Sequence, residues 1–348
     1  MSAIAPASPV AEGQPAGPAE PPAGPGAAGD VRAGEGLPAE LVKRFARALA
    51  RLNPGGGRIG LAVSGGPDSL ALLVLAQAAV PGAFEVASVN HGLRPEAAGE
   101  CALVQAACAE RGAACAVLAV AVGAGNLQAE ARAARYAALG RWAGERGLAA
   151  LATGHQADDQ AETLLMRLGR GCGVAGLAGV RERGVVPGSA LPLIRPLLGF
   201  RRAELERVVA AAGLVPASDP SNADERFERV RMRRALAGEA LPDPLALATS
   251  AAHLAEAEEA LRWAAEREWA ERVAVSAAEI RYRPLAPRAV ALRIVERAVT
   301  ELGGAPRGSA AARLLDSLRS GERGNLGGVL ARVEGDGWVF TPEPPRRS

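Results

Sequence analysis

Cysteine, histidine, lysine and aromatic residues are all scarce in this sequence, and each shortage narrows the kinds of protein it can encode. The four cysteines, Cys101, Cys108, Cys115 and Cys172, form no Cys-x-x-Cys pair, so neither a zinc site nor a dithiol redox centre is indicated. We interpret them as reduced core residues of a cytoplasmic protein. Aromatic residues make up 3% of the chain, so any stacking on nucleic-acid bases would depend on very few side chains.

Long apolar runs are also lacking, and their absence argues against a membrane-spanning segment. The first 35 residues have neither the basic start nor the continuous apolar stretch of a secretory signal. Their Ala, Pro and Gly content cannot build a packed core, so we expect residues 1–35 to form a disordered tail.

Positive charge comes almost wholly from arginine, because Lys43 is the single lysine. The 40 basic and 38 acidic side chains nearly cancel, so the net charge says little about binding partners. Arginine is nevertheless the better phosphate ligand, since its planar guanidinium donates two parallel hydrogen bonds. A coding bias toward Ala, Gly, Pro and Arg would explain the same composition.

The chain of 348 residues is too long for one small core, and its pattern divides into two parts. In the first part, apolar runs that predict strands alternate with segments that predict helices. The expected strands are residues 59–63, 84–90, 114–122, 148–155 and 191–197. Continuous apolar strands separated by helices predict a doubly wound, Rossmann-like α/β domain with a parallel sheet, over residues 36–235.

Residues 236–348 predict a second, smaller and mainly helical domain. The run 245–273 predicts one or two helices, two further helical segments follow, and residues 327–343 predict a closing hairpin with the turn EGDG. From the pattern alone, this domain is a packing or homodimerisation appendage.

Polar stretches follow three of the expected strands. They are SGGPDS (64–69), NHGLR (90–94) and GHQADDQAET (154–163). In doubly wound sheets, ligands bind beyond the carboxyl ends of the strands. We therefore expect an active site where these three stretches meet.

The first stretch combines small, conformationally free residues with hydroxyl groups. Its glycines let a ligand approach the main chain, and successive N–H groups at the start of a helix bind anions. No Gly-Lys-Ser/Thr follows, so it is not a Walker A loop. The expected phosphate ligands are Ser64, Gly65, Gly66, Pro67, Asp68 and Ser69. The alternative is an ordinary capped turn between a strand and a helix.

This loop resembles the S-G-G-x-D-S loop of the PP-loop ATP pyrophosphatases. Together with VNHGLRPEA (89–97), ARAARYAAL (131–139), the run 153–179 and DPSNADERFERVRMR (219–233), it makes the chain similar to the tRNA(Ile)-lysidine synthetases over roughly residues 57–235. One departure is Val230, which stands where that family often has Asn.

The resemblance implies a tRNA-modifying ligase. Such enzymes use ATP to adenylate the C2 oxygen of the wobble cytidine in tRNA(Ile) with a CAU anticodon. The ε-amine of free L-lysine then attacks C2, and AMP leaves after pyrophosphate. Mg²⁺ is expected to neutralise the pyrophosphate, with Asp68 as its ligand. A PP-loop tRNA thiolase and a non-catalytic nucleotide-binding module are the alternatives.

Three acidic residues follow the fourth strand and are candidates to take part in this reaction. Asp159 and Glu162 are three residues apart and share one helix face, and Asp158 and Glu162 are four apart. They could hold the ammonium group of lysine or take its proton, and with Asp68 we regard Asp159 and Glu162 as catalytic candidates. The alternative is that they only complement the helix dipole.

Histidines and arginines complete the candidate site. By resemblance, the residues that contact lysine, nucleotide or phosphate are His91, Arg94, Arg132, Arg135, His155 and Asp158, and those that bind tRNA are Arg229, Arg231 and Arg233. Without the resemblance, Arg132 and Arg135 are equally a solvated stripe. The arginine cluster between residues 201 and 234 also includes Arg201, Arg202 and Arg226, and intervening acids make an ion-paired helix surface its alternative. The resemblance further implies that residues 236–348 help to hold the tRNA.

Overall fold

The computed structural model describes residues 36–92, 96–120, 127–217, 226, 228–236, 238, 241–306 and 308–344. The expected N-terminal tail, Arg94 and residues 219–225 of the last family motif lie outside these ranges.

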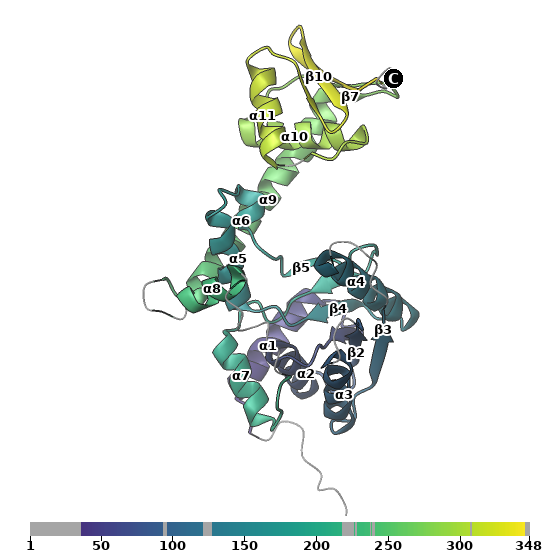
Figure 1. Ribbon diagram of the computed structural model, residues 1–348, viewed down its shortest axis with the longest axis vertical. Helices are drawn as coiled ribbons and strands as arrows, with labels where there is room; N and C mark the ends of the chain where they lie inside the picture. Colours follow the sequence, from purple (N-terminus) through teal and green to yellow (C-terminus); the bar gives the residue numbers. More distant parts are fainter. Residues whose placement is uncertain are drawn as a thin grey trace, which may run out of the picture.

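The larger part of the molecule is built on a six-stranded sheet in the order β3-β2-β1-β4-β6-β5 (Figure 1). The strands are β1 Ile59–Ala62, β2 Phe84–Asn90, β3 Cys115–Ala119, β4 Ala150–Thr153, β5 Arg183–Val185 and β6 Pro192–Ile194. All neighbours pair in parallel except β5, which lies antiparallel to β6 at the edge. The expected parallel sheet is confirmed, and β5, with three residues, escaped prediction because it is too short to show a period.

Helices cover both faces of this sheet, as the unbroken apolar strands predict. The first face carries α1 Ala39–Leu52, α2 Pro67–Ala79, α3 Glu96–Ala109 and α7 Arg202–Ala211, whose apolar side chains form one core with β1 and β2. The opposite face carries α4 Leu127–Glu145, which buries Tyr136, Leu139 and Trp142 against β2 and β4.

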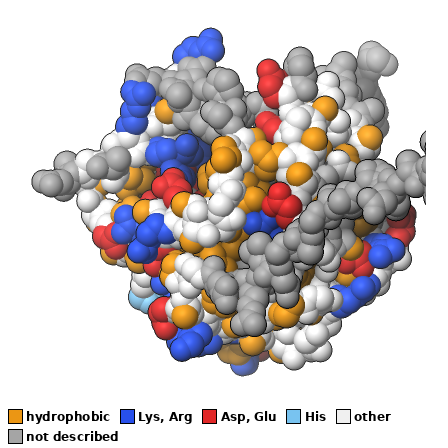
Figure 2. All heavy atoms as spheres, turned by 90° about the horizontal axis from the view of Figure 1, so that it is seen from below, with side chains coloured by type: hydrophobic (Ala, Val, Ile, Leu, Met, Phe, Trp, Pro, Cys, Tyr) orange, Lys and Arg blue, Asp and Glu red, His pale blue; other side chains and the backbone are white. Residues whose placement is uncertain are grey.

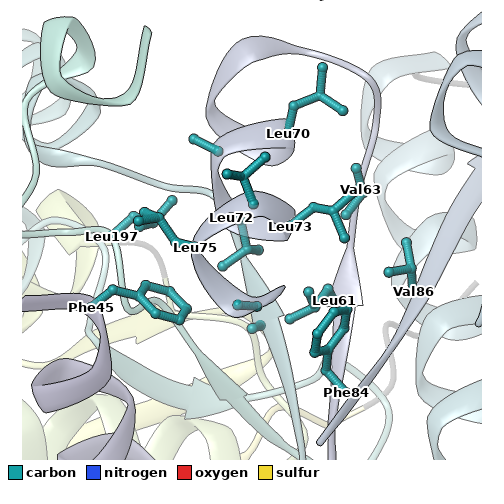
Figure 3. Packing of buried hydrophobic residues seen from close by; sticks show 14 of the residues in the cluster. Phe45, Leu61, Val63, Leu70, Leu72, Leu73, Leu75, Phe84, Val86 and Leu197 are labelled. Atoms are coloured by element: carbon teal, nitrogen blue, oxygen red, sulfur yellow. The ribbon is translucent and has the colours of Figure 1, made fainter. Parts of the chain in front are cut away.

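The central helix α2 is buried on all sides, which explains why its sequence has no polar face. Residues 69–76 are all buried, with β1 and β2 on one side and α1 and α7 on the other. Figure 3 shows Leu72, Leu73 and Leu75 of α2 among Phe45 of α1 and Phe84 of β2. Replacing one such leucine by alanine costs about 2–5 kcal/mol, so the loop that starts α2 rests on a rigid base.

The smaller part combines helices with an antiparallel sheet in the order β7-β8-β11-β10-β9. Its elements are β7 Val273–Val275, β8 Ile280–Tyr282, α10 Arg288–Glu301, α11 Gly308–Arg319, β9 Gly324–Leu326, β10 Val329–Glu334 and β11 Gly337–Pro342. The expected hairpin is confirmed by β10 and β11, which pair from Val329 with Pro342 to Glu334 with Gly337. The three other strands were not expected, since each has only three residues.

One long helix, α9 Pro244–Arg272, joins the two parts (Figure 1). Its 29 residues span about 43 Å. It packs on α5 Ala157–Leu168 and α6 Val174–Leu177 of the larger part and on α10 of the smaller one, while α8 Glu228–Leu236 also lies on α5. A domain boundary at residue 236 stays a prediction, because α9 contributes to both parts. None of the described helices has both the length and the apolar character needed to cross a bilayer.

Candidate active site

A cavity of about 680 Å³ opens at the carboxyl ends of β1, β2 and β4. β2 and β3 follow β1 in the chain and lie on one side of β1 within the sheet, whereas β4 lies on the other side of β1. Ligands of doubly wound sheets bind at such a reversal of strand order. Ala62 pairs with both Ala87 and Thr153, so β1 and β4 end level while β2 continues to Asn90. Residues from the stretches that follow all three strands line the cavity.

The loop 64–69 lies at this reversal and forms one wall of the cavity. Gly65 has φ +86°, a conformation that other residues rarely adopt, and a Cβ there would lie 3.3 Å from the carbonyl oxygen of Glu100. Gly66 is the N-cap of α2 and has no side chain to cap it, which argues against a simple capped turn. The start of α2 therefore faces the cavity with its positive dipole end.

The two serines of the loop bond within it. The Ser64 N–H donates to Ser69 Oγ at 3.2 Å, and the Ser69 hydroxyl donates to the Gly66 carbonyl at 2.9 Å. Both side chains also line the cavity. These hydrogen bonds stabilise the conformation of the loop without needing a ligand.

Gly154 brings the loop after β4 into direct contact with this wall. A Cβ on Gly154 would lie 2.9 Å from the Asp68 carbonyl oxygen, closer than real Cβ atoms come to another atom, and 3.1 Å from the Ser69 nitrogen. Glycine is therefore required there, because the backbones after β1 and β4 touch.

Asp68 has a carboxylate oxygen, Oδ1, that is buried without a hydrogen-bond partner. Burial and the nearby charge of Asp159 raise the pKa of Asp68 to about 7. A lone acceptor in the loop expected to bind phosphate suits Mg²⁺, which uses one or two carboxylates together with substrate phosphates. The residues thus fit the expected metal, although no group of three metal-binding side chains occurs among the described residues.

Glu162 is fully buried, with no exposed side-chain surface, and three arginines surround it. Arg229 Nε donates to Oε2 at 2.6 Å, while Arg233 Nε and Arg202 Nη2 donate to Oε1 at 3.0 and 3.2 Å. Burial by itself would raise the pKa of Glu162, but the hydrogen bonds from Arg229 and Arg233 outweigh it and lower that pKa.

Asp159 both caps α5 and faces the cavity. Its Oδ2 accepts from the Gln156 N–H at 3.3 Å in a capping box, and its Oδ1 accepts from Arg229 Nη2 at 3.0 Å. Burial raises the pKa of Asp159, and the charge of Arg229 opposes that rise. Asp158 does not line the cavity: its Oδ2 accepts from the Arg202 backbone N–H at 2.8 Å.

His91, Arg135 and His155 line the same cavity. His155 Nδ1 lies 2.9 Å from Thr153 Oγ1, and burial together with the charge of Arg195 lowers the pKa of His155 to about 3. The imidazole is therefore neutral at physiological pH and cannot supply a proton as imidazolium.

The arginines of α4 surround a buried tyrosine. Tyr136 lines the cavity with a buried hydroxyl that has no partner, and the guanidinium carbons of Arg132 and Arg135 lie 5.1 and 5.4 Å from its ring centre. Arg132 is exposed and is not part of the cavity wall.

The arginines expected to bind tRNA divide between two environments. Arg229 and Arg233 line the cavity and pair with acids of α5, whereas Arg231 is exposed and donates to the Arg226 carbonyl at 3.2 Å. Val230 lies between Arg229 and Arg231 in the sequence. Its side chain is buried and provides an apolar contact where the family often has Asn. On the face shown in Figure 2, basic and acidic side chains are interspersed rather than separated into a basic surface.

Sequence reasoning missed Tyr136 and placed Arg202 on a basic surface rather than in the cavity. Arg202 begins α7, which follows β6, the fifth parallel strand. Applying the rule of carboxyl strand ends to that strand also would have found it. Arg94 lies outside the described residues.

A glycine loop before a buried helix, at the strand-order reversal of a doubly wound sheet, defines a nucleotide-binding α/β protein of the PP-loop class. Residues 39–240 match the ATP_bind_3 family, described as a PP-loop domain. A solved structure, the U34-tRNA thiolase NcsA from Methanococcus maripaludis with its [4Fe-4S] cluster, shares the fold. Its TM-score is 0.51 with 18% identity, over 64% of this chain and 80% of that one.

Two relatives specify the family further. The chain is 48% identical over 312 residues to the tRNA(Ile)-lysidine synthase of Novosphingobium aromaticivorans, covering 88% of this chain and 95% of the relative. It is 39% identical over 302 residues to the tRNA(Ile)-lysidine synthase of Zymomonas mobilis, covering 85% and 91%. The chain belongs to the tRNA(Ile)-lysidine synthase family of PP-loop enzymes.

Proposed function

We propose that this chain is the ligase that joins free L-lysine to C2 of the wobble cytidine in tRNA(Ile) with a CAU anticodon. In the first step the C2 oxygen attacks the α-phosphorus of ATP and pyrophosphate leaves. In the second step the lysine ε-amine attacks C2, and the C2–O bond breaks to release AMP. The observation that carries the proposal is a single cavity lined both by the loop 64–69 and by Asp159 of α5, which shares Arg229 with the buried Glu162.

The loop 64–69 and the start of α2 would hold the ATP phosphates. Main-chain N–H groups at a helix start bind anions without a charged side chain, which suits a loop that lacks lysine and arginine. Asp68 would ligate Mg²⁺ through the oxygen that has no protein partner. The metal would supply charge neutralisation for the leaving pyrophosphate.

The acid pair would bind the lysine side chain and make its amine nucleophilic. The ε-ammonium arrives charged and must lose a proton before it attacks. Asp159 is the better acceptor, because burial raises its pKa and so its affinity for a proton. His155 is neutral and would contact substrate or nucleotide by hydrogen bonding, as would His91 and Arg135.

We also assign the smaller part of the molecule, and α9 with it, to tRNA binding. Of the four tryptophans, Trp142 and Trp338 are buried and Trp269 lies under the guanidinium of Arg297, but Trp263 of α9 is 63% exposed. The guanidinium carbon of Arg267 lies 5.2 Å from the Trp263 ring centre. An exposed indole beside an arginine is a suitable surface for stacking an unpaired base.

A transcript of tRNA(Ile) with a CAU anticodon tests the reaction. Incubation with ATP, Mg²⁺ and L-lysine should raise the mass of the wobble nucleoside by lysine minus water, and omission of lysine should abolish the product. A thiolase would add sulfur and ignore lysine, and a nucleotide-binding module would release no pyrophosphate. Either result would refute the proposal. The cysteines do not favour the thiolase, since Cys101 and Cys108 are buried and unpaired.

A further inference from the structure

One guanidinium already occupies the place where a lysine ammonium would bind. Arg229 donates from Nη2 to Asp159 Oδ1 at 3.0 Å and from Nε to Glu162 Oε2 at 2.6 Å, so it bridges the two acids. These two oxygens are the ones that an ammonium group would need in order to be held by both carboxylates. Glu162 has no exposed surface, and lysine cannot reach its Oε2 while Arg229 is present.

The other two arginines are arranged differently. Arg233 and Arg202 bond to Oε1 of Glu162, the opposite carboxylate oxygen, and Arg202 lies 3.7 Å from Asp159. If Arg229 left, Glu162 would still have two cationic partners, and the large cost of an uncompensated buried charge would be avoided. Only the two oxygens that Arg229 had bonded would become free.

Arg229 is also the most exposed of the three arginines. Its side chain is 47% exposed, against 33% for Arg233 and 19% for Arg202. It belongs to α8, whose nine residues contribute Val230 as their buried side chain. A phosphate group near this helix would compete directly for the guanidinium, because phosphate accepts two parallel hydrogen bonds from arginine.

We propose that Arg229 is a placeholder cation that keeps the lysine site closed until a tRNA phosphate draws the guanidinium away. The inference rests on the proposed function, since it takes Asp159 and Glu162 as the lysine site. It explains how the enzyme would avoid holding and deprotonating lysine before the tRNA is bound. Because coupling between two ligands is reciprocal, tRNA raises the affinity for lysine by the same factor as lysine raises the affinity for tRNA.

Calorimetric titration of L-lysine into the full chain, with and without the tRNA(Ile) transcript, tests this. For the unmodified protein, tRNA should lower the lysine Kd. Arg229→Gln should lower the lysine Kd without tRNA by roughly tenfold to a hundredfold, the equivalent of one or two charge-assisted hydrogen bonds no longer to be displaced. Addition of tRNA should then bring little further gain.

Two other variants separate this effect from simpler ones. Arg141→Gln removes a cation from an exposed position on α4 and should leave the lysine Kd unchanged. Arg170→Gln removes the ion pair that holds Glu228 of α8 but leaves Arg229 on both acids, so its Kd should also stay near that of the unmodified protein. Far-ultraviolet circular dichroism checks that each variant is folded.

The outcomes distinguish a failure of the placeholder role from a failure of the proposed function. If the unmodified protein binds lysine in the presence of tRNA but Arg229→Gln binds it no more tightly without tRNA, the placeholder role is refuted and the proposed function survives. If Arg170→Gln tightens binding as much as Arg229→Gln, general loosening of α8 is the cause and the placeholder is again refuted. If no form binds lysine even with tRNA and ATP present, both proposals fail.

Discussion

Replacement of Glu162 by glutamine should be the most destabilising polar substitution at this site. The change removes a charge that has no exposed surface and receives hydrogen bonds of 2.6, 3.0 and 3.2 Å from three guanidiniums. Breaking a buried ion pair by neutralising one partner costs about 3–5 kcal/mol. Because the side chains of Arg229 and Arg233 are 47% and 33% exposed, water compensates part of the loss, and the lower end of about 3 kcal/mol applies.

Urea unfolding followed by circular dichroism measures the effect. With a slope of about 3 kcal/mol/M, the midpoint of Glu162→Gln should fall by roughly 1 M. Glu145→Gln, on the exposed surface of α4, should unfold like the unmodified protein. Equal midpoints for the two variants would refute the reasoning, because they would show that the three arginine contacts of Glu162 contribute no net stability.

The pH dependence of the same measurement provides a second check. The folded state lowers the pKa of Glu162 below 4.5, so its contribution to stability is present above pH 4.5 and is lost as the pH falls through the folded value. The difference between the unmodified protein and Glu162→Gln should therefore shrink in acid. A difference that stayed constant with pH would mean that lost packing, rather than lost charge, causes the destabilisation.

Three further substitutions probe the other walls of the cavity and the long helix. At pH values above 7, Asp68→Asn should need more urea than the unmodified protein to unfold. The same variant should lose Mg²⁺-dependent ATP binding. Burial raises the pKa of Asp68 from 3.8 to about 7, so stability falls as pH rises through that window, and the gain of the variant should vanish toward pH 3.8. Gly154→Ala should abolish ATP binding in calorimetry, because its Cβ would force the two loops apart; Gly144→Ala, whose Cβ meets open space on α4, should bind ATP normally. Trp263→Ala should weaken binding of the tRNA by about 1–3 kcal/mol in a filter assay, as loss of one stacked base predicts, whereas Val185→Ala, 59% exposed on β5 of the larger part, should not.

Each of these three has a contradicting result. A midpoint for Asp68→Asn that matches the unmodified protein at all pH values would show that the charge of Asp68 costs the fold nothing. ATP binding by Gly154→Ala would show that the contact between the loops is not needed for the nucleotide site. Unchanged tRNA affinity in Trp263→Ala would remove α9 from the proposed tRNA surface.

The sequence by itself determined the parallel sheet, the position of its glycine loop and the closing hairpin. These features depend on local pattern: unbroken apolar runs for strands covered on both faces, and turn residues at their ends. The meeting of the stretches 64–69 and 154–163 was also predictable, because carboxyl ends of parallel strands lie at one edge of a sheet. The strands of three residues were not predictable, and neither was the fact that α9 is one continuous helix. Neither feature produces a distinct period in the sequence.

Only the tertiary structure decided what the charged residues of the cavity do. The sequence suggested a basic surface for Arg229 and Arg233, yet both bond to Glu162, which lies 67 and 71 positions earlier in the chain. In the same way, folding buried Tyr136 in the cavity wall and left Trp263 exposed on a helix surface. Burial and long-range ion pairing depend on which elements pack together, and no residue spacing encodes that. The acids were recognisable from sequence as a site for a cation, but the cation that occupies it here became visible only once α8 was placed against α5.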